Sequence, residues 1–396
     1  MGARSMANRA HQAVRLCQAT RTHRAARSAR ASRPPARVLR GALYLVLLVL
    51  LLCLCLSLSG CGTTSTKSAG ASKKADSSKS ASASKKGAET PLKDQPDISG
   101  IRKLPASYRT PARHRGKVTS ISYAVTTPAG ARITKKALVY IPYGYSDTRR
   151  YDVFYLLHGY GGSEATFLGA PSKPRTFRNI LDHMIDRGDM APAIVVTPTL
   201  AYHAYSDYYT MLEATDREIT EVLVPLVEGR WSTYARSTDR AGLQASRAHR
   251  AIGGFSVGGC MTWRMLKDNA DLFQWYLPCS MPLYYYEKGY DPAQNETGTK
   301  DILAGVQAAR ARLNAAMPLY IFAASGGKDF MCEATRQQAL ALSQQSSLFT
   351  WSSDCAFSSG NITFHAWSGR PHRYTQSFDY LYNGLIRFYK KVPAGK

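Results

Sequence analysis

Acidic residues are missing from the first 61 residues of this chain, which hold ten arginines and no aspartate or glutamate. The formal net charge of the 396 residues is +25, so this short segment carries a large share of it. Residues 62–100 hold seven lysines and four acids, and the remaining charge is spread along the chain without a dense basic block. This distribution argues against nucleic-acid binding and predicts a basic surface near an anionic envelope.

Metal-binding patterns are also missing, because the sequence contains no Cys-x-x-Cys pair and no cluster of histidines. We therefore expect no metal site. After Cys61 only Cys260, Cys279, Cys332 and Cys355 remain, and they allow three disulfide connectivities outside the cell. The pairs nearest in sequence, Cys260–Cys279 and Cys332–Cys355, are favoured, and four buried free thiols are the alternative.

An uncharged apolar run covers residues 42–58 and follows arginines that end at Arg40. This is the pattern of an export signal. The run ends in Leu58-Ser59-Gly60-Cys61, which resembles the bacterial lipobox, whose cysteine is acylated and whose cleavage occurs just before it. Residues 1–61 are therefore predicted to be a lipoprotein signal peptide, with an uncleaved membrane anchor as the alternative. Either interpretation predicts a domain tethered at the extracellular face of the cell envelope.

Residues 62–90 have no aromatic or branched aliphatic side chain and consist almost entirely of Ser, Thr, Lys, Ala and Gly. Such a segment buries too little apolar surface to offset its ordering entropy. We predict a flexible linker over residues 62–97 and a folded domain over residues 98–396.

The remaining sequence alternates between apolar strand patterns and helical patterns. An antiparallel pair is expected first, at 118–125 and 138–141. Further strands are expected at 153–157, 193–197, 251–252, 273–279, 319–323 and 363–367, and helices at 177–187, 211–228, 260–266, 333–343 and 374–389. This order predicts an α/β fold with a mostly parallel central sheet and helices on both faces. Residues 285–316 fit no sheet element and are predicted to be an insertion that forms a lid or a pocket wall.

A nucleophile motif lies in the middle of this domain. Gly254-Phe255-Ser256-Val257-Gly258 fits G-x-S-x-G, between a predicted strand and a predicted helix. A serine on such a sharp turn directs its Oγ into a cleft, and the helix N-terminus behind it offers backbone N–H groups to a developing oxyanion. Ser256 is therefore the candidate nucleophile of an α/β-hydrolase fold.

A serine nucleophile needs a histidine base, and in α/β-hydrolases this histidine follows the serine in the chain. Only His365 and His372 follow Ser256. His365 lies within a predicted strand, where a structural role is expected. His372 lies in a loop after that strand, and loops at the carboxyl ends of strands carry the chemistry of such sheets. His372 is therefore the candidate base.

The orienting acid is expected between the serine and the histidine. Asp329 follows two glycines in a loop directly after the strand 319–323, which makes it the candidate. Its rivals are Glu333, inside a predicted helix, and Asp354, at the wrong end of a strand. A capping role for Asp329 ahead of the helix 333–343 is the structural alternative.

An oxyanion hole needs two N–H donors. The first is expected to be the backbone N–H of Val257, and the second to come from the loop after the strand 153–157. Tyr160 is the candidate in that loop, and Gly161 is the next choice. His158 precedes the serine and is expected to hold the loop by hydrogen bonding.

Taken together, these motifs resemble the Putative esterase family (the esterase D and feruloyl esterase group) over roughly residues 115–390. The matching segments are YDVFYLLHGYGGSEATF at 151–167, AIVVTP at 193–198, RAIGGFSVGG at 250–259, the Gly-Gly-Lys-Asp loop and the His372 loop. The resemblance implies an α/β-hydrolase fold with Ser256 as nucleophile, Asp329 as acid and His372 as base. The sequence departs from the family pattern at Val257, where methionine is usual, at the altered loop 369–373 and at an insertion over 237–248.

The expected function is that of a tethered extracellular serine carboxylic ester hydrolase that needs no cofactor. The resemblance implies feruloyl or acetyl esters of plant polysaccharide as substrates. Tyr284, Tyr285 and Tyr286 are candidates for a stacking wall, with ordinary packing as the alternative. An acyltransferase similar to the mycolyltransferases, which pass an acyl group to a sugar, and a non-catalytic binding lipoprotein are the alternative functions.

Overall fold

A computed structural model describes residues 98–389, apart from 202–203, 206–207, 285–290 and 314–315. The export run 42–58, the lipobox at Cys61 and the linker 62–97 lie outside these residues. Within the described residues, no helix has both the length and the apolar character needed to cross a bilayer.

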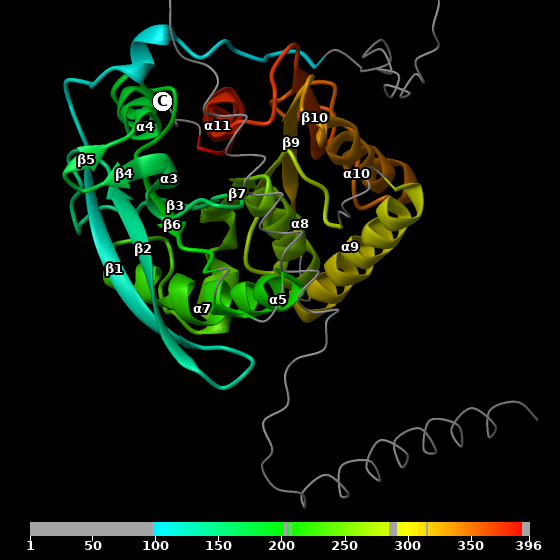
Figure 1. Ribbon diagram of the computed structural model, residues 1–396, viewed down its shortest axis with the longest axis horizontal. Coiled ribbons are helices and arrows are strands. Elements are labelled where there is room, and N and C mark those ends of the chain that lie inside the picture. The colour runs from blue at the N-terminus through cyan, green and yellow to red at the C-terminus, as the bar shows by residue number, and fades with distance from the viewer. Residues whose placement is uncertain (1–97, 202–203, 206–207, 285–290, 314–315, 390–396) are drawn as a thin grey trace, which may run out of the picture. The chain divides into compact units, whose positions relative to one another are not determined.

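An eight-stranded sheet forms the centre of the domain, in the order β1-β2-β6-β3-β7-β8-β9-β10 (Figure 1). The strands are β1 Lys117–Thr126, β2 Arg132–Ile141, β3 Asp152–Leu157, β6 Ala193–Pro198, β7 Arg250–Phe255, β8 Trp275–Cys279, β9 Tyr320–Gly326 and β10 Ile362–Trp367; β4 Gly169–Ala170 and β5 Lys173–Pro174 pair separately. Strand β1 is antiparallel to β2, and β2 is antiparallel to β6. The other six strands, β6, β3, β7, β8, β9 and β10, run parallel to one another. The expected α/β fold and its opening antiparallel pair are confirmed.

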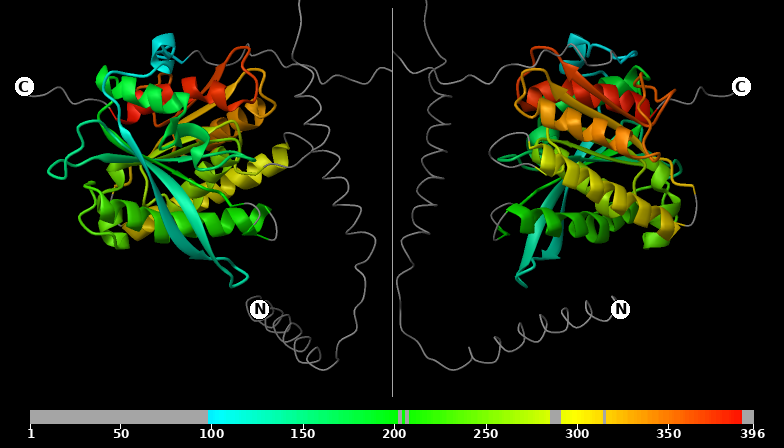
Figure 2. Two further views of the ribbon diagram at one scale, coloured as in Figure 1. Left: turned by 60° about the vertical axis from the view of Figure 1, so that its left-hand side comes forward. Right: turned by 90° about the vertical axis from the view of Figure 1, so that its right-hand side faces the viewer.

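Helices cover both faces of this sheet (Figure 2). They are α3 Ala165–Leu168, α4 Thr176–Asp186, α5 Tyr208–Glu218, α6 Val224–Arg230, α7 Arg240–Ala245, α8 Val257–Asn269, α9 Pro292–Leu313, α10 Cys332–Gln345 and α11 Ser377–Phe388, with short turns η2 Ala106–Arg109, η4 Ile219–Leu223, η5 Arg247–His249 and η6 Tyr374–Gln376. A π-helical turn, η4, joins α5 to α6, so the helix expected over 211–228 is a composite. The expected insertion 237–248 forms α7 and η5.

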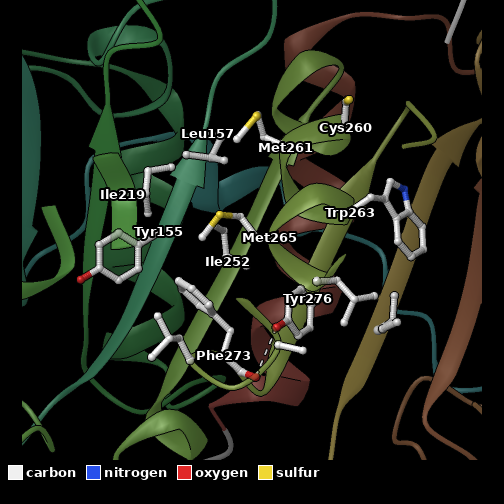
Figure 3. Close-up of a cluster of buried hydrophobic side chains, with 14 of the residues drawn as sticks. Tyr155, Leu157, Ile219, Ile252, Cys260, Met261, Trp263, Met265, Phe273 and Tyr276 are labelled. Atoms are coloured by element: carbon white, nitrogen blue, oxygen red, sulfur yellow. Dashed lines mark hydrogen bonds between the residues drawn. The ribbon is translucent and has the colours of Figure 1, made fainter. Parts of the chain in front are cut away.

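Alternating side chains of the central strands divide the core into two clusters. In β3, Val153, Tyr155 and Leu157 join the cluster covered by α5, α8, α9 and α10, drawn in part in Figure 3. Phe154 and Leu156 point to the other face and join the cluster with α3, α4 and α11. All five side chains are almost completely buried. A strand buried on both faces reads as a continuous apolar run, as it does here.

The insertion expected over residues 285–316, as a lid or a pocket wall, is not what the structure shows for residues 292–313. They form one helix, α9, that packs against α8 and α10 as part of the layer over the sheet. Its buried positions are Gly298, Thr299, Ile302, Val306 and Ala309, and the apolar side chains among them begin only at Ile302. The first turns are polar, and this masked the helical period.

A buried ion pair anchors the start of β7, the strand that leads to Ser256. Arg250 donates from Nε and Nη2 to the two carboxylate oxygens of Glu228, at 2.5 and 2.7 Å. Its Nη1 donates to the backbone oxygen of Leu243. The two charges are almost fully buried, so their hydrogen bonds must offset a large desolvation penalty. The geometry orients one end of β7 while the opposite end carries the nucleophile motif.

Candidate active site

Ser256 lies on a strained turn between β7 and α8, with φ of 59° and ψ of −120°. A non-glycine residue rarely adopts such a backbone conformation, and the surroundings hold it there. Its N–H donates to the backbone oxygen of Cys279 at 2.9 Å. A Cβ on Gly258 would overlap the carbonyl oxygen of Leu157, and one on Gly254 would lie 2.6 Å from the backbone of Gly258. The two glycines therefore let the turn pack against the end of β3.

His372 links Ser256 to Asp329 by hydrogen bonds. Its Nδ1 lies 2.8 Å from Asp329 Oδ1, and its Nε2 lies 3.0 Å from Ser256 Oγ. A carboxylate only accepts, so Nδ1 carries the proton that is donated to Asp329. Nε2 then has a lone pair that accepts from the Ser256 hydroxyl. The three residues picked from the sequence thus form one Ser-His-Asp chain, in which the imidazole is poised to take the hydroxyl proton.

Two loops at the carboxyl ends of β9 and β10 bring Asp329 and His372 together. Gly327 donates to the backbone oxygen of Trp367 at 2.7 Å, and Lys328 donates to that of Arg370 at 3.0 Å. The side chain of Asp329 is buried, and its Oδ1 also accepts from the N–H of Met331 at 2.8 Å.

This second hydrogen bond of Asp329 lies just before α10. The N-cap residue of α10 is Met331, and no side chain caps this helix, so the capping alternative for Asp329 is wrong.

The rival candidates have other partners. Glu333 accepts from Arg336 and Gln337 on its own helix, at 2.7 Å in each case. Asp354 accepts from backbone N–H groups of the loop that follows it. His365 lies on β10 and packs edge-on against the ring of Trp367.

The loop after β3 lies directly against Ser256. A Cβ on Gly159 would be 2.9 Å from the Cβ of Ser256, so only glycine permits this approach. Tyr160 follows in the same loop, and Val257 is the first residue of α8. The first N–H groups of a helix have no partner within the helix. The two candidate oxyanion donors are therefore near the serine, one on each neighbouring segment.

His158 holds this loop in place, as expected. Its Nε2 accepts from the N–H of Leu200 at 2.9 Å, so the ring proton must be on Nδ1, which lies 2.8 Å from the backbone oxygen of Gly159. Burial lowers the pKa of His158 and favours this neutral form. Both nitrogens are engaged with backbone groups, so His158 joins the loops after β3 and β6.

Two phenylalanines flank the His372 ring, and sequence reasoning missed both. The ring centroids of Phe255 and Phe330 each lie 4.6 Å from that of His372. Phe255 is buried beside the ring of Tyr374, whereas Phe330 is exposed. Their positions in the sequence, directly before Ser256 and directly after Asp329, were the available signal.

All four described cysteines are free, buried thiols. The favoured pairings Cys260–Cys279 and Cys332–Cys355 are therefore not formed, and the alternative of four free thiols is the one observed. Cys260 and Cys332 belong to one core cluster, and Cys279 and Cys355 to the other. The sheet thus separates the two members of each expected pair.

The expected stacking wall is only partly visible. Tyr284 is half-buried, and its hydroxyl donates to Asp301 Oδ2 of α9 at 2.7 Å. Tyr285 and Tyr286 lie outside the described residues. In the part of the chain that the structure describes, no group of three or more His, Cys, Asp or Glu is arranged to hold a metal ion.

Residues 133–348 match the protein family described as Putative esterase. Among curated proteins, the chain is 32% identical over 288 residues to endo-1,4-beta-xylanase Y of Acetivibrio thermocellus, covering 73% of this chain and 24% of that protein. It is 27% identical over 218 residues to an endo-1,4-beta-xylanase/feruloyl esterase of Xylanibacter ruminicola, covering 52% of this chain and 26% of that protein. The chain thus spans about a quarter of these relatives.

A solved structure resembles the domain in both sequence and fold. It is a serine-to-alanine mutant of the feruloyl esterase module from Clostridium thermocellum, complexed with sinapinate. The TM-score is 0.61 at 29% identity, and the match covers 76% of this chain and 97% of the module.

Proposed function

Since the chain belongs to the Putative esterase family and is a feruloyl esterase-like carboxylic ester hydrolase, we propose that Ser256, His372 and Asp329 carry out its chemistry. The observation that supports this most is the continuous hydrogen-bonded chain from Ser256 Oγ through His372 to Asp329. It lies at the carboxyl ends of parallel strands, where α/β enzymes bind their ligands.

In the proposed acylation step, Ser256 Oγ attacks the ester carbonyl carbon while its proton moves to Nε2 of His372. Asp329 keeps the other ring proton on Nδ1 and stabilises the imidazolium that forms. The N–H groups of Val257 and Tyr160 donate to the oxyanion of the tetrahedral intermediate. The C–O bond then breaks, and the alcohol leaves with the proton from Nε2.

In the proposed deacylation step, water attacks the acyl-Ser256 ester and gives its proton to Nε2 of His372. The second tetrahedral intermediate collapses to the free carboxylic acid, and Ser256 recovers its proton. Every proton and electron pair is thus supplied by the ester, water and the three side chains, so this route uses no cofactor.

The proposed substrates are acyl esters of polysaccharide, with feruloyl esters first and acetyl esters second. The curated relatives are a xylanase and a xylanase/feruloyl esterase, and the similar module is complexed with sinapinate. These names support a substrate that combines a hydroxycinnamoyl group with a plant polysaccharide.

A tether is the last part of the proposal. Cleavage before Cys61 and acylation of its thiol would leave the domain on a linker at the extracellular face of the bacterial membrane. The basis is the lipobox-like Leu58-Ser59-Gly60-Cys61 at the end of the apolar run. Metabolic labelling with a fatty acid, lost in Cys61→Ala, tests this part by itself.

The test of the catalytic proposal is hydrolysis of methyl ferulate and 4-nitrophenyl acetate by the full-length protein and by Ser256→Ala. We expect the variant to lose turnover of both esters by at least about 10⁴-fold. Ser280→Ala is a matched control, because Ser280 also has a positive φ, of 58°, and follows the neighbouring strand β8, but its side chain is buried away from the proposed site. It should keep its activity within a few-fold.

Turnover that survives in Ser256→Ala would contradict the proposed nucleophile. Transfer of the feruloyl group to an added sugar, in preference to water, would instead assign the protein as an acyltransferase.

A further inference from the structure

Exposed aromatic side chains gather at the proposed active site. Among the described residues, five large hydrophobic side chains are exposed, and the two most exposed are Tyr160 at 68% and Phe330 at 66%. Tyr160 follows Gly159, which touches Ser256, and Phe330 packs on His372. Both are therefore one contact away from the residues that meet the ester.

Phe330 differs from the other ring on His372. Phe255 lies at the same centroid distance of 4.6 Å but is only 3% exposed, so it already supports the imidazole from the core side. Phe330 is tilted by 44° to the imidazole and leaves two thirds of its surface in water. The Phe330 side chain has no polar atom that water could solvate, and little of its apolar surface is buried by the fold.

The loop directs Phe330 outward by anchoring both of its neighbours. Asp329 and Met331 are 5% and 3% exposed, and the Met331 N–H donates to Asp329 Oδ1 at 2.8 Å. The N–H of Cys332 also donates to the backbone oxygen of Asp329, at 2.9 Å. The backbone on each side of Phe330 is thus held by the same carboxylate residue that orients His372, so the ring has a defined position beside the site.

We propose that Phe330, assisted by Tyr160, is the platform on which the flat ring of an aryl acyl group stacks, and that it sets the preference for hydroxycinnamoyl over small acyl groups. This inference rests on the proposed function and deepens it. In a hydroxycinnamoyl ester the ring is three bonds from the carbonyl carbon that Ser256 attacks. His372 Nε2 lies 3.0 Å from Ser256 Oγ, and the Phe330 ring packs on the same imidazole. The aromatic ring of an acyl group bound at Ser256 is therefore within reach of the Phe330 ring.

Stacking suits this position because it needs area and orientation but no hydrogen bond. Aromatic pairs prefer offset or edge-to-face contacts, and they also remove apolar surface from water on both partners. An acetyl group has no ring and gains none of this contact. The effect should therefore depend on the acyl group and appear mainly in KM.

The experiment compares kcat/KM for 4-nitrophenyl ferulate and 4-nitrophenyl acetate, which share one leaving group, in the full-length protein. We expect Phe330→Ala to lower kcat/KM for the ferulate ester by about tenfold or more and for the acetate ester by less than threefold. Phe330→Trp should restore the ferulate value, and Phe330→Leu should restore only part of it.

Tyr143→Ala is the matched control. Tyr143 is 58% exposed and also packs on a histidine, His114, at a centroid distance of 4.7 Å. It precedes β3 and so lies at the opposite edge of the parallel sheet from Ser256. This variant should leave both esters and their ratio unchanged.

An equal loss for both esters in Phe330→Ala would overturn the inference, because it would mean that Phe330 merely supports His372. An unchanged ferulate value would overturn it as well. Failure of the proposed function has a different signature, since the unmodified protein would then show no Ser256-dependent turnover of either ester.

Discussion

Two histidines at the same edge of the sheet, His372 and His158, each join two loops, yet they have different partners. His372 meets side chains, Ser256 Oγ at 3.0 Å and Asp329 Oδ1 at 2.8 Å. His158 meets backbone groups, the N–H of Leu200 at 2.9 Å and the oxygen of Gly159 at 2.8 Å. The partners, rather than the residue type, therefore decide which ring has a hydroxyl proton to accept.

The protonation of the two rings follows from the same contacts. Both carry their proton on Nδ1, but Nε2 of His158 accepts a hydrogen bond from a backbone N–H, which is too weak an acid to transfer its proton. Nε2 of His372 faces a hydroxyl group, whose proton leaves when the oxygen forms a new bond. One ring is thus suited to fixing a loop, and the other to moving a proton.

The largest effect should come from breaking the acid side of His372. In Asp329→Asn the side-chain amide can donate to Nδ1, which favours the wrong tautomer and leaves Nε2 protonated against Ser256 Oγ. We expect kcat for 4-nitrophenyl acetate to fall by about 10⁴-fold with little change in the melting temperature. Steady-state kinetics and differential scanning calorimetry measure the two quantities.

Glu333→Gln is the control for this substitution, because Glu333 binds residues of its own helix at 2.7 Å. It should retain the activity of the unmodified protein. A comparable loss of kcat in Asp329→Asn and Glu333→Gln would contradict the proposed role of Asp329 as the acid that orients His372.

A smaller effect is expected from breaking the backbone contacts of His158. His158→Ala deprives Leu200 and Gly159 of their partner and loosens the loop that carries Tyr160. We expect kcat/KM to fall by about 10²-fold, comparable to the loss of one oxyanion donor. Loss of about 2 kcal/mol of buried hydrogen bonding should lower the melting temperature by about 5 °C.

His249→Ala is the corresponding control. His249 also has a hydrogen bond, to Asp152 Oδ1 at 2.7 Å, but it precedes β7 at the far edge of the sheet. It should keep full activity. If His158→Ala lowers stability but not activity, His158 serves the fold and not the oxyanion loop.

The smallest effect concerns pH. Burial lowers the pKa of His158, so below its ordinary value of about 6.5 the unfolded chain binds a proton that the folded chain does not. The stability from neutral His158 is fully present above about pH 6.5 and is lost as the pH falls toward the folded pKa. His158→Gln keeps a donor and an acceptor but does not titrate, so its melting temperature should fall less between pH 7.5 and 5.5. An identical pH dependence in both proteins would refute this linkage.

Much of the site was predictable because its parts are local in sequence. The run Gly254 to Gly258 encodes a strand, a tight turn and a helix start, and its glycines are the residues that allow close packing there. Asp329 and His372 follow strands directly, and parallel strands bring their carboxyl ends to one edge. The positions of all three side chains thus follow from order along the chain and a single rule of sheet topology.

Other features needed distances across the fold. The cysteines of each expected pair were near in sequence but lie in clusters on opposite faces of the sheet. The buried apolar side chains of α9 begin only at Ile302, so the helix was mistaken for an insertion. Phe255 and Phe330 both pack on the ring of His372, although they are 75 positions apart in the chain.

By itself, the sequence determined the order of the eight central strands along the chain, the α/β architecture and the residues able to form a Ser-His-Asp chain, because periodicity and turn chemistry are local properties. Tertiary structure decided which contacts these residues make. It set the partners of His372 and His158, kept the thiols apart and turned Phe330 outward beside the proposed base. The physical reason is that side chains distant in sequence meet only when the strands pair into the sheet and helices pack on its two faces.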